Sequence, residues 1–261
     1  MFAEKQILLF KTITRSSFSK SFGHGIQAII ATLIVLILPE KYWYHTAFRI
    51  SFLYRLSIIR FKRSISIAHR RAEILNTLLG FLTRANKPFP IPCSLSGFDL
   101  LSDATTGTAF CTVHLPLVKV AISAALTNGF KIDAAIVASP NANELMSVWG
   151  ITQKIPTIQS SSQSLFKAKK ILTQNGCVLL MLDAFYGDNY SPNIMHVAGL
   201  TGSKAVFFIA ELSPNGMIDI QILPFPNPFC TNEIAIAENI QYVSDTVQQV
   251  HARYRSQSFW Q

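Results

Sequence analysis

The feature that most constrains the fold is a regular alternation of two patterns after residue 97. Short apolar runs of strand length alternate with stretches of helical periodicity, an order typical of a largely buried sheet with crossover helices. The sequence therefore predicts an α/β fold with a mixed, mostly parallel sheet flanked by helices. The predicted strands are residues 109–115, 134–138, 178–183, 205–212 and 217–225. The predicted helices are residues 116–127, 141–148, 162–173 and 232–254.

The last two predicted strands are separated by a short turn-forming segment. Its sequence is Ser213-Pro214-Asn215-Gly216, and Pro and Asn-Gly are residues that tight turns favour. A short connection of this kind joins adjacent strands as a β-hairpin. The sequence thus predicts that the last two strands form a hairpin.

The most apolar stretch of the chain runs from Gly25 to Pro39. As a helix it would span about 22 Å at 1.5 Å per residue, less than the roughly 30 Å hydrocarbon core of a bilayer. Lys20 and Lys41 flank this stretch, and Trp43 and Tyr44 follow it. This arrangement favours a tilted or re-entrant membrane anchor with aromatic side chains at the interface. An ordinary buried helix is the alternative.

Positive charge is concentrated in the N-terminal part of the chain. Residues 1–71 hold twelve Lys and Arg against two Glu, a balance of +10, whereas the whole chain carries +9. Only 14% of all residues are charged, against about 25% in typical soluble domains. Because the basic residues are interleaved with apolar runs, they favour anionic lipid over nucleic acid as a partner. Over residues 46–82, predicted to be helical, a solvated basic face is the alternative.

A proline-rich stretch marks the predicted domain boundary. Three prolines, Pro88, Pro90 and Pro92, lie within five residues and cannot continue a helix. We therefore predict an N-terminal membrane-associating helical segment over residues 1–84, a connector over residues 85–97 and an α/β domain over residues 98–261.

Several classes of site are not indicated by the sequence. The four cysteines are widely spaced and fit neither a disulfide framework nor a zinc site, which favours a reducing compartment. There is no G-x-S-x-G nucleophile elbow, phosphate loop or dinucleotide fingerprint. We expect no metal, no cofactor and no nucleic-acid partner. Two of the cysteines, Cys111 and Cys177, lie in apolar runs and are predicted to be core residues.

One residue with chemical potential stands at the end of a predicted strand. The segment TAFCTVHLPLVK places His114 there, and Pro116 would open the next helix. Catalytic groups of α/β sheets gather at the carboxyl ends of strands, where a histidine can act as a general base near neutral pH. A structural histidine is the alternative.

The ordered segments resemble a known family. After the basic and apolar N-terminal segment come GFDLL (97–101), the strand ending in His114, GCVLLMLDAFYGD (176–188), VAGLTGSKAVFFIAEL (197–212) and NGMIDIQILPFPNP (215–228). This order is similar to that of the lipid A late acyltransferases, the lauroyl and myristoyl transferases of the lysophospholipid acyltransferase superfamily. The resemblance covers roughly residues 25–261, including Trp260.

The resemblance implies transfer of a fatty acyl group from an acyl-carrier-protein or CoA thioester to a lipid or glycolipid hydroxyl. It also implies a location at the cytoplasmic face of the inner membrane, as a monotopic protein or with a single short anchor. In this family a His and an acid five positions later form the catalytic pair. His114 matches the base, but Lys119 stands at the acid position. A cation there would oppose formation of the imidazolium.

Asp183 is the predicted substitute for the missing acid. It ends the run VLLMLD and matches an acidic family residue at the equivalent strand end, where it would orient His114 or bind the acceptor; a cap for the following loop is the alternative. We predict His114 and Asp183 as the catalytic residues.

Weaker candidates are Asp188 and Glu211, while Lys167, Lys169 and Lys170 are either a solvated helix face or a contact for an acidic carrier protein. The second hypothesis is an inactive relative that binds a lipid or an acylated carrier.

Overall fold

The protein is described here by a computed structural model, which covers residues 22–51, 67–83, 91–101, 105–137, 155–161, 163–183, 189–230 and 232–256. Within these residues the strands form one seven-stranded sheet in the order β1-β7-β6-β2-β5-β3-β4. The strands are β1 (Cys93–Ser96), β2 (Thr108–Thr112), β3 (Ala134–Val137), β4 (Thr157–Gln159), β5 (Cys177–Met181), β6 (Lys204–Leu212) and β7 (Ile218–Pro224).

Strand direction confirms the predicted mixed, mostly parallel sheet. Strands β2 to β6 run parallel to one another, whereas β7 pairs antiparallel with β6 and β1 pairs parallel with β7. The turn between β6 and β7 is the predicted hairpin, and Gly216 adopts a φ of 84° in it, which favours glycine. We call the edge where β2 to β6 end the carboxyl edge and the opposite edge the amino edge.

Burial explains why some strands were evident in the sequence and others were not. Every residue of β2, at the centre of the sheet, is buried, whereas burial in β7 alternates along the strand. Strands β1 and β4 lie at the two ends of the sheet, and neither was predicted. The exposed, largely polar β1 falls within the range predicted as a connector, and β4 has only three residues. Neither strand gives the apolar signal of a buried one.

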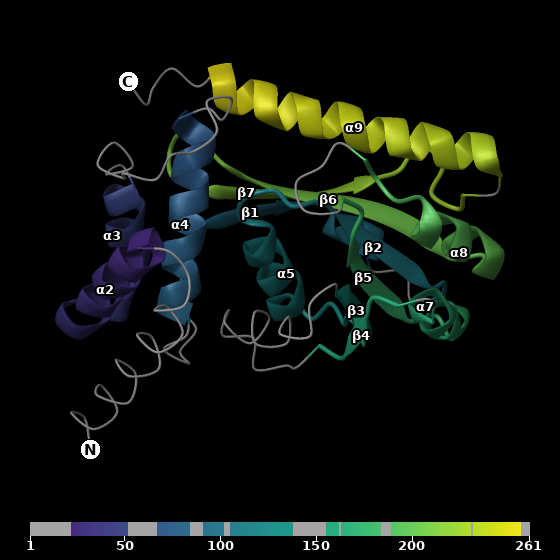
Figure 1. Ribbon diagram of the computed structural model, residues 1–261, viewed down its shortest axis with the longest axis horizontal. Coiled ribbons are helices and arrows are strands. Elements are labelled where there is room, and N and C mark those ends of the chain that lie inside the picture. The colour runs from purple at the N-terminus through teal and green to yellow at the C-terminus, as the bar shows by residue number, and fades with distance from the viewer. Residues whose placement is uncertain are drawn as a thin grey trace.

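In the described residues of the α/β part, four helices flank the sheet. They are α5 (Val118–Thr127), α7 (Ser164–Thr173), α8 (Asn193–Thr201) and α9 (Glu233–Ser256). Helix α9 lies along one face of the sheet and α5 on the other (Figure 1). Helix α8 was not predicted, and the predicted helix 141–148 lies outside the described residues. The prediction that Pro116 opens a helix was wrong, because α5 begins at Val118.

The N-terminal part contributes further helices, which lie together on the left of Figure 1. They are α2 (Phe22–Ile37), the 3-10 turn η1 (Glu40–Tyr42), α3 (Trp43–Ile50) and α4 (Ile67–Thr83). Helix α4 contacts α2, α3, α9 and β6. None of the helices in the described part of the chain is both long and apolar enough to cross a membrane.

The expected exposure of Trp43 and Tyr44 at a membrane interface was wrong. Both side chains are buried in the protein. The Trp43 indole N–H donates to the carbonyl oxygen of Leu38 at 2.9 Å, and the Tyr44 hydroxyl donates to that of Gly216 at 2.6 Å. The hydrogen bond of Tyr44 thus holds α3 against the β6–β7 hairpin, at the carboxyl edge of the sheet, whereas that of Trp43 is local.

Candidate active site

The pairing of two central strands places His114 and Asp183 next to each other at the ends of these strands. Strands β2 and β5 are parallel neighbours, and Thr112 is opposite Met181 at their ends. The pairing continues one step further, because the backbone N–H of Leu182 donates to the carbonyl oxygen of Thr112 at 2.7 Å. His114 and Asp183 each lie two residues beyond this last register pair. They therefore meet at the carboxyl edge, where α/β proteins place their ligands.

Asp183 binds both the ring and the backbone of His114. Its Oδ1 lies 3.0 Å from His114 Nδ1, and the His114 backbone N–H donates to Oδ1 at 2.9 Å and to Oδ2 at 3.1 Å. An ionised carboxylate only accepts hydrogen bonds, so Nδ1 carries the proton. In the neutral ring the basic lone pair then lies on Nε2. The carboxylate fixes both the position and the tautomer of the imidazole.

The two side chains differ in their access to solvent. The Asp183 side chain is 4% exposed, whereas that of His114 is 27% exposed. A buried carboxylate behind a partly exposed imidazole is the arrangement in which the acid orients the base and the base meets the substrate. The structure thus brings the two predicted catalytic residues together in the expected order.

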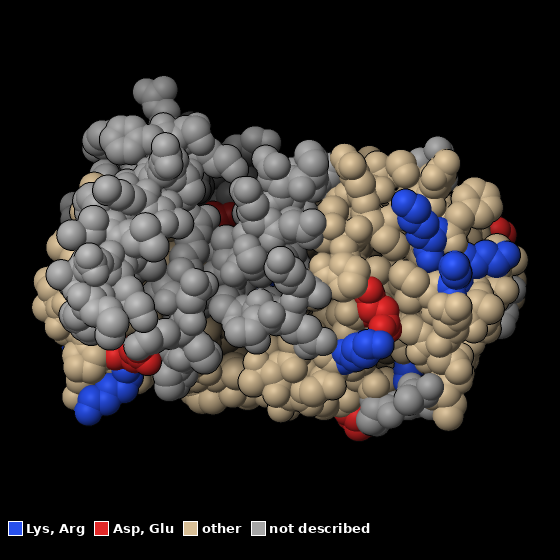
Figure 2. Space-filling model, turned by 90° about the horizontal axis from the view of Figure 1, so that it is seen from below, with Lys and Arg blue, Asp and Glu red and all other residues tan. Residues whose placement is uncertain are grey.

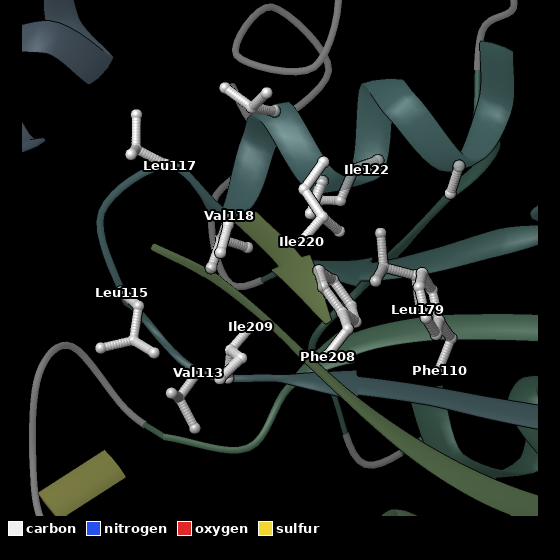
Figure 3. Close-up of a cluster of buried hydrophobic side chains, with 14 of the residues drawn as sticks. Phe110, Val113, Leu115, Leu117, Val118, Ile122, Leu179, Phe208, Ile209 and Ile220 are labelled. Atoms are coloured by element: carbon white, nitrogen blue, oxygen red, sulfur yellow. The ribbon is translucent and has the colours of Figure 1, made fainter. Parts of the chain in front are cut away.

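The His114 loop is held by its neighbours in the core. The backbone N–H of Leu115 donates to the carbonyl oxygen of Val113 at 2.7 Å, which places His114 at the centre of a three-residue γ-turn. Val113, Leu115 and Leu117 are buried on either side of it, in the cluster drawn in Figure 3. The buried neighbours thus hold the backbone on both sides of His114, whose own side chain is partly exposed.

Leu117 adopts an unusual backbone conformation next to the site. Its φ is 69°, in the left-handed region that bulky side chains disfavour by about 1–2 kcal/mol. The side chain is fully buried in the same cluster, and this packing offsets the backbone strain. Strained residues of this kind concentrate at functional sites. No sequence pattern marks Leu117, because a leucine in this conformation has no characteristic signal.

Asp183 and the residue before it form backbone contacts with residues 190 and 191. Asp183 forms an isolated antiparallel bridge with Tyr190, and the backbone N–H of Ser191 donates to the carbonyl oxygen of Leu182 at 2.7 Å. Leu182 itself is buried. The chain that leaves β5 therefore returns beside it, which confines the Asp183 carboxylate. Sequence reasoning identified Asp183 but gave no indication of the Tyr190 contact.

Lys119 lies in the first turn of α5 and is partly buried. The family pattern would place an acid here, on the same chain segment as His114. In this protein the carboxylate beside His114 instead comes from the neighbouring strand. His114 therefore has an acidic partner, Asp183, although position 119 is not acidic.

The weaker candidates have other contacts or lie outside the description. Glu211 forms a two-pronged ion pair with Arg253, with Oε1 2.9 Å from the Arg253 Nη2, and this pair links β6 to α9. Asp188 lies outside the described residues. Lys167, Lys169 and Lys170 are exposed along α7. Glu211 therefore has a structural role that accounts for its position at the end of a strand.

A large cavity lies at the amino edge of the sheet. It has a volume of about 680 Å³ and is lined by residues at the start of β2 and β5 and at the ends of α5 and α7, including Thr106, Lys131 and Asp133. His114 does not line this cavity. At the carboxyl edge the chain continues through residues 138–154 after β3 and 184–188 after β5, which are not described. The candidate site is the pair of His114 and Asp183, because a candidate general base is recognised by its geometry and not by the volume of a nearby cavity.

A comparison of the chain with models of known protein families finds no match, and a comparison with curated proteins finds none either.

Proposed function

We propose that the protein is an acyltransferase that uses His114 as its general base. It would move a fatty acyl group from an acyl-carrier-protein or CoA thioester to the hydroxyl of a lipid or glycolipid. The observation that carries this proposal is the hydrogen bond from His114 Nδ1 to the buried carboxylate of Asp183 at the carboxyl edge. This contact supplies the acidic partner that position 119 lacks.

The chemistry follows from the tautomer that Asp183 imposes. His114 Nε2 takes the proton of the acceptor hydroxyl while the oxygen attacks the thioester carbonyl carbon. The resulting tetrahedral intermediate collapses, the carbon–sulfur bond breaks, and the departing thiolate receives the proton from the imidazolium. Asp183 stays ionised throughout and stabilises the imidazolium through Nδ1–H. In this scheme His114 is the catalytic residue and Asp183 is a positioning residue.

The proposed location is the cytoplasmic face of the inner membrane. The acceptor lipid resides in the bilayer, and the protein must therefore approach its surface. Support comes from the +10 balance of residues 1–71 and from the apolar stretch Gly25 to Pro39 within them. The donor would arrive from solution as a carrier-protein or CoA thioester.

The second candidate is a protein of the same architecture that binds a lipid or an acylated carrier without transferring the acyl group. The observation that favours it is Lys119, a cation where the related enzymes have an acid. The two candidates differ in one respect that can be measured, which is whether any acyl transfer depends on His114.

The test is acyl transfer from a panel of acyl-carrier-protein and acyl-CoA donors to lipid and glycolipid acceptors. We expect His114→Ala to lower the rate by about 10²–10⁴-fold, the usual contribution of a general base. The matched control is His196→Ala, because His196 Nδ1 also faces a carboxylate, that of Glu233 at 3.5 Å, but belongs to α8. It should leave the rate unchanged. Transfer that persists in His114→Ala would refute the mechanism.

Lys119→Asp separates the two candidates. If the protein is an enzyme, the wild type is active, and an acid at position 119 changes the rate only modestly because Asp183 already orients the base. If it is a binder, the wild type is silent. Activity that appears only in Lys119→Asp would identify a disabled enzyme and contradict the proposal.

A further inference from the structure

Helix α2 has an exposed apolar face. Ile29, Leu33, Leu36 and Ile37 recur at the spacing of one helix face, and their exposed fractions range from 42% to 71%. The opposite face is buried through Ala28, Ala31, Thr32 and Ile34. Helix α2 contacts α4, and the small alanines permit this close approach. The chain thus places large aliphatic side chains on the surface even though the helix has a packed face.

A shallow groove beside this face is apolar throughout. Its volume is about 220 Å³, and it is lined by Ile30, Leu33, Ile34, Ile37, Leu38 and Ile50. Every lining residue is aliphatic, so the groove offers no hydrogen bond to a polar ligand. It extends the exposed face of α2 toward α3. Surfaces of this kind mark contact with a membrane or another protein.

Basic side chains follow directly after α2. Lys41, His45 and Arg49 recur at every fourth residue, and all three are exposed. Tyr42 is exposed as well, and Lys41 Nζ lies 5.0 Å from the centre of its ring. Within residues 22–51 Glu40 is the only carboxylate in the sequence. An apolar face next to cations and nearly free of acidic residues matches a bilayer that contains anionic headgroups.

We propose that α2 docks in the plane of an anionic lipid bilayer through the face formed by Ile29, Leu33, Leu36 and Ile37. At 16 residues α2 is about 24 Å long, shorter than the roughly 30 Å hydrocarbon core, so it lies along the surface and does not span it. Lys41 and Arg49 contact the headgroups. This inference rests on the membrane location in the proposed function, and it is independent of acyl transfer.

The helix that follows α2 is anchored at the same edge of the sheet as His114 and Asp183. Helix α3, which follows α2, is tied to the β6–β7 hairpin by the hydrogen bond from Tyr44 to Gly216, and this hairpin lies at the carboxyl edge. The N-terminal helices lie together at one end of the sheet (Figure 1). Seen from below, the described surface of the rest of the molecule is largely uncharged, with its Lys and Arg in a few places (Figure 2). Docking through α2 would bring the carboxyl edge close to the lipid.

The test is flotation of the full-length protein with vesicles of phosphatidylcholine alone and of phosphatidylcholine and phosphatidylglycerol in equal parts. The double variant Leu33→Gln/Leu36→Gln should lower the partition coefficient about tenfold or more on both kinds of vesicle. The matched control is Leu200→Gln, which removes a leucine that is 75% exposed on α8 and should have no effect. Unchanged thermal melting would show that the variants are folded.

The contribution of charge is measured separately. Lys41→Gln/Arg49→Gln should weaken binding to the anionic vesicles by about fivefold or more for each cation in contact, and should leave binding to phosphatidylcholine unchanged. A wild-type protein that floats with neither vesicle would overturn the proposal, as would equal binding by wild type and the leucine double variant.

Two further outcomes are informative. If sedimentation shows a wild-type dimer that the leucine double variant dissociates while vesicle binding is unchanged, the face is a contact between copies and the proposal is wrong. Docking and chemistry are separable, because His114→Ala should float like the wild type. With a detergent-dispersed acceptor the α2 variants should transfer acyl groups at the wild-type rate.

Discussion

The two edges of the sheet carry carboxylates in contrasting surroundings. At the carboxyl edge Asp183 is almost fully buried and holds His114 through its backbone and ring. At the amino edge Asp133 accepts a hydrogen bond from the backbone N–H of Cys177 at 2.8 Å and pairs with Lys131, whose side chain is 75% exposed. The larger cavity lies beside Asp133, yet the only histidine–carboxylate pair at a described strand end is at the other edge.

The two carboxylates differ in what they hold. Asp133 satisfies the first backbone N–H of β5 and meets a solvated cation, which is a common way to finish a strand. Asp183 instead fixes a titratable ring at the surface while staying buried itself. We therefore base the proposed site on the environment of the carboxylate and not on the size of the nearby cavity.

The largest expected effect is on activity, and it distinguishes Asp183 from Asp133. Asp183→Asn keeps the shape of the side chain but removes the charge that stabilises the imidazolium, so acyl transfer should fall about 10²-fold or more. Asp133→Asn should stay within about twofold of wild type, since an amide oxygen can still accept from Cys177. Steady-state rates with the same donor and acceptor measure both. Equal losses of activity in the two variants would mean that Asp183 has no special role in the reaction.

A smaller effect is expected on folding. Asp183→Ala leaves the backbone N–H of His114 without its acceptor in a partly buried position, which should lower the free energy of unfolding by about 1–3 kcal/mol. Urea unfolding monitored by circular dichroism gives this value. A change below about 0.5 kcal/mol would show that water replaces the carboxylate at no cost.

Two buried tyrosines make the carboxyl edge sensitive to alkali. Tyr44 donates to Gly216, and the backbone N–H of Leu212 donates to the Tyr254 hydroxyl at 3.1 Å. Burial raises the pKa of both phenols well above the ordinary value of 10.0. Above pH 10 the unfolded phenol loses its proton while the folded one keeps it, so stability present below pH 10 is lost as the pH rises, by about 1.4 kcal/mol per pH unit for each tyrosine.

The measurement is unfolding free energy as a function of pH for wild type, Tyr44→Phe and Tyr254→Phe. Each variant should be less stable at neutral pH by about 1 kcal/mol for the lost hydrogen bond, and its stability should decline less steeply in alkali. Tyr42→Phe is the control, because the Tyr42 ring is exposed. Variants that decline as steeply as the wild type would argue against these phenols as the cause.

The smallest effect is expected at the amino edge. Lys131→Ala removes an ion pair whose cation is solvated, and solvated pairs contribute about 0–1 kcal/mol. Its effect on urea unfolding should therefore be below that of Asp183→Ala, and addition of salt should reduce it further. If Lys131→Ala lowered the free energy of unfolding as much as Asp183→Ala, the two edges would not differ in their contribution to stability.

Much of the sheet could be predicted because buried strands have a strong signal. The apolar runs that form β2, β5 and β6 mark central strands by composition alone, and the turn residues before Gly216 mark the hairpin. The same pattern placed His114 and Asp183 at strand ends. Residues such as Cys93 and Thr157 gave no such signal, because the end strands that contain them are short or exposed.

The contact between His114 and Asp183 required more than the pattern. Sequence identifies two strand ends, but only the pairing of Thr112 with Met181 shows that the strands are neighbours in matching register. Likewise, Trp43 and Tyr44 were expected at a membrane interface because their spacing from the apolar stretch fits one. Their burial depends on contacts with residues as distant as Gly216, which local patterns do not encode.

The claim that Asp183 holds the His114 ring with Nδ1 protonated is tested most directly by nitrogen NMR of the histidine side chains. The His114 signals are assigned as those missing from His114→Ala, and the spectrum is recorded at a pH where the ring is neutral. We predict a protonated Nδ1 and an unprotonated Nε2 in the wild type, and loss of this preference in Asp183→Ala. A neutral wild-type ring protonated at Nε2 would contradict the assignment of Nε2 as the base.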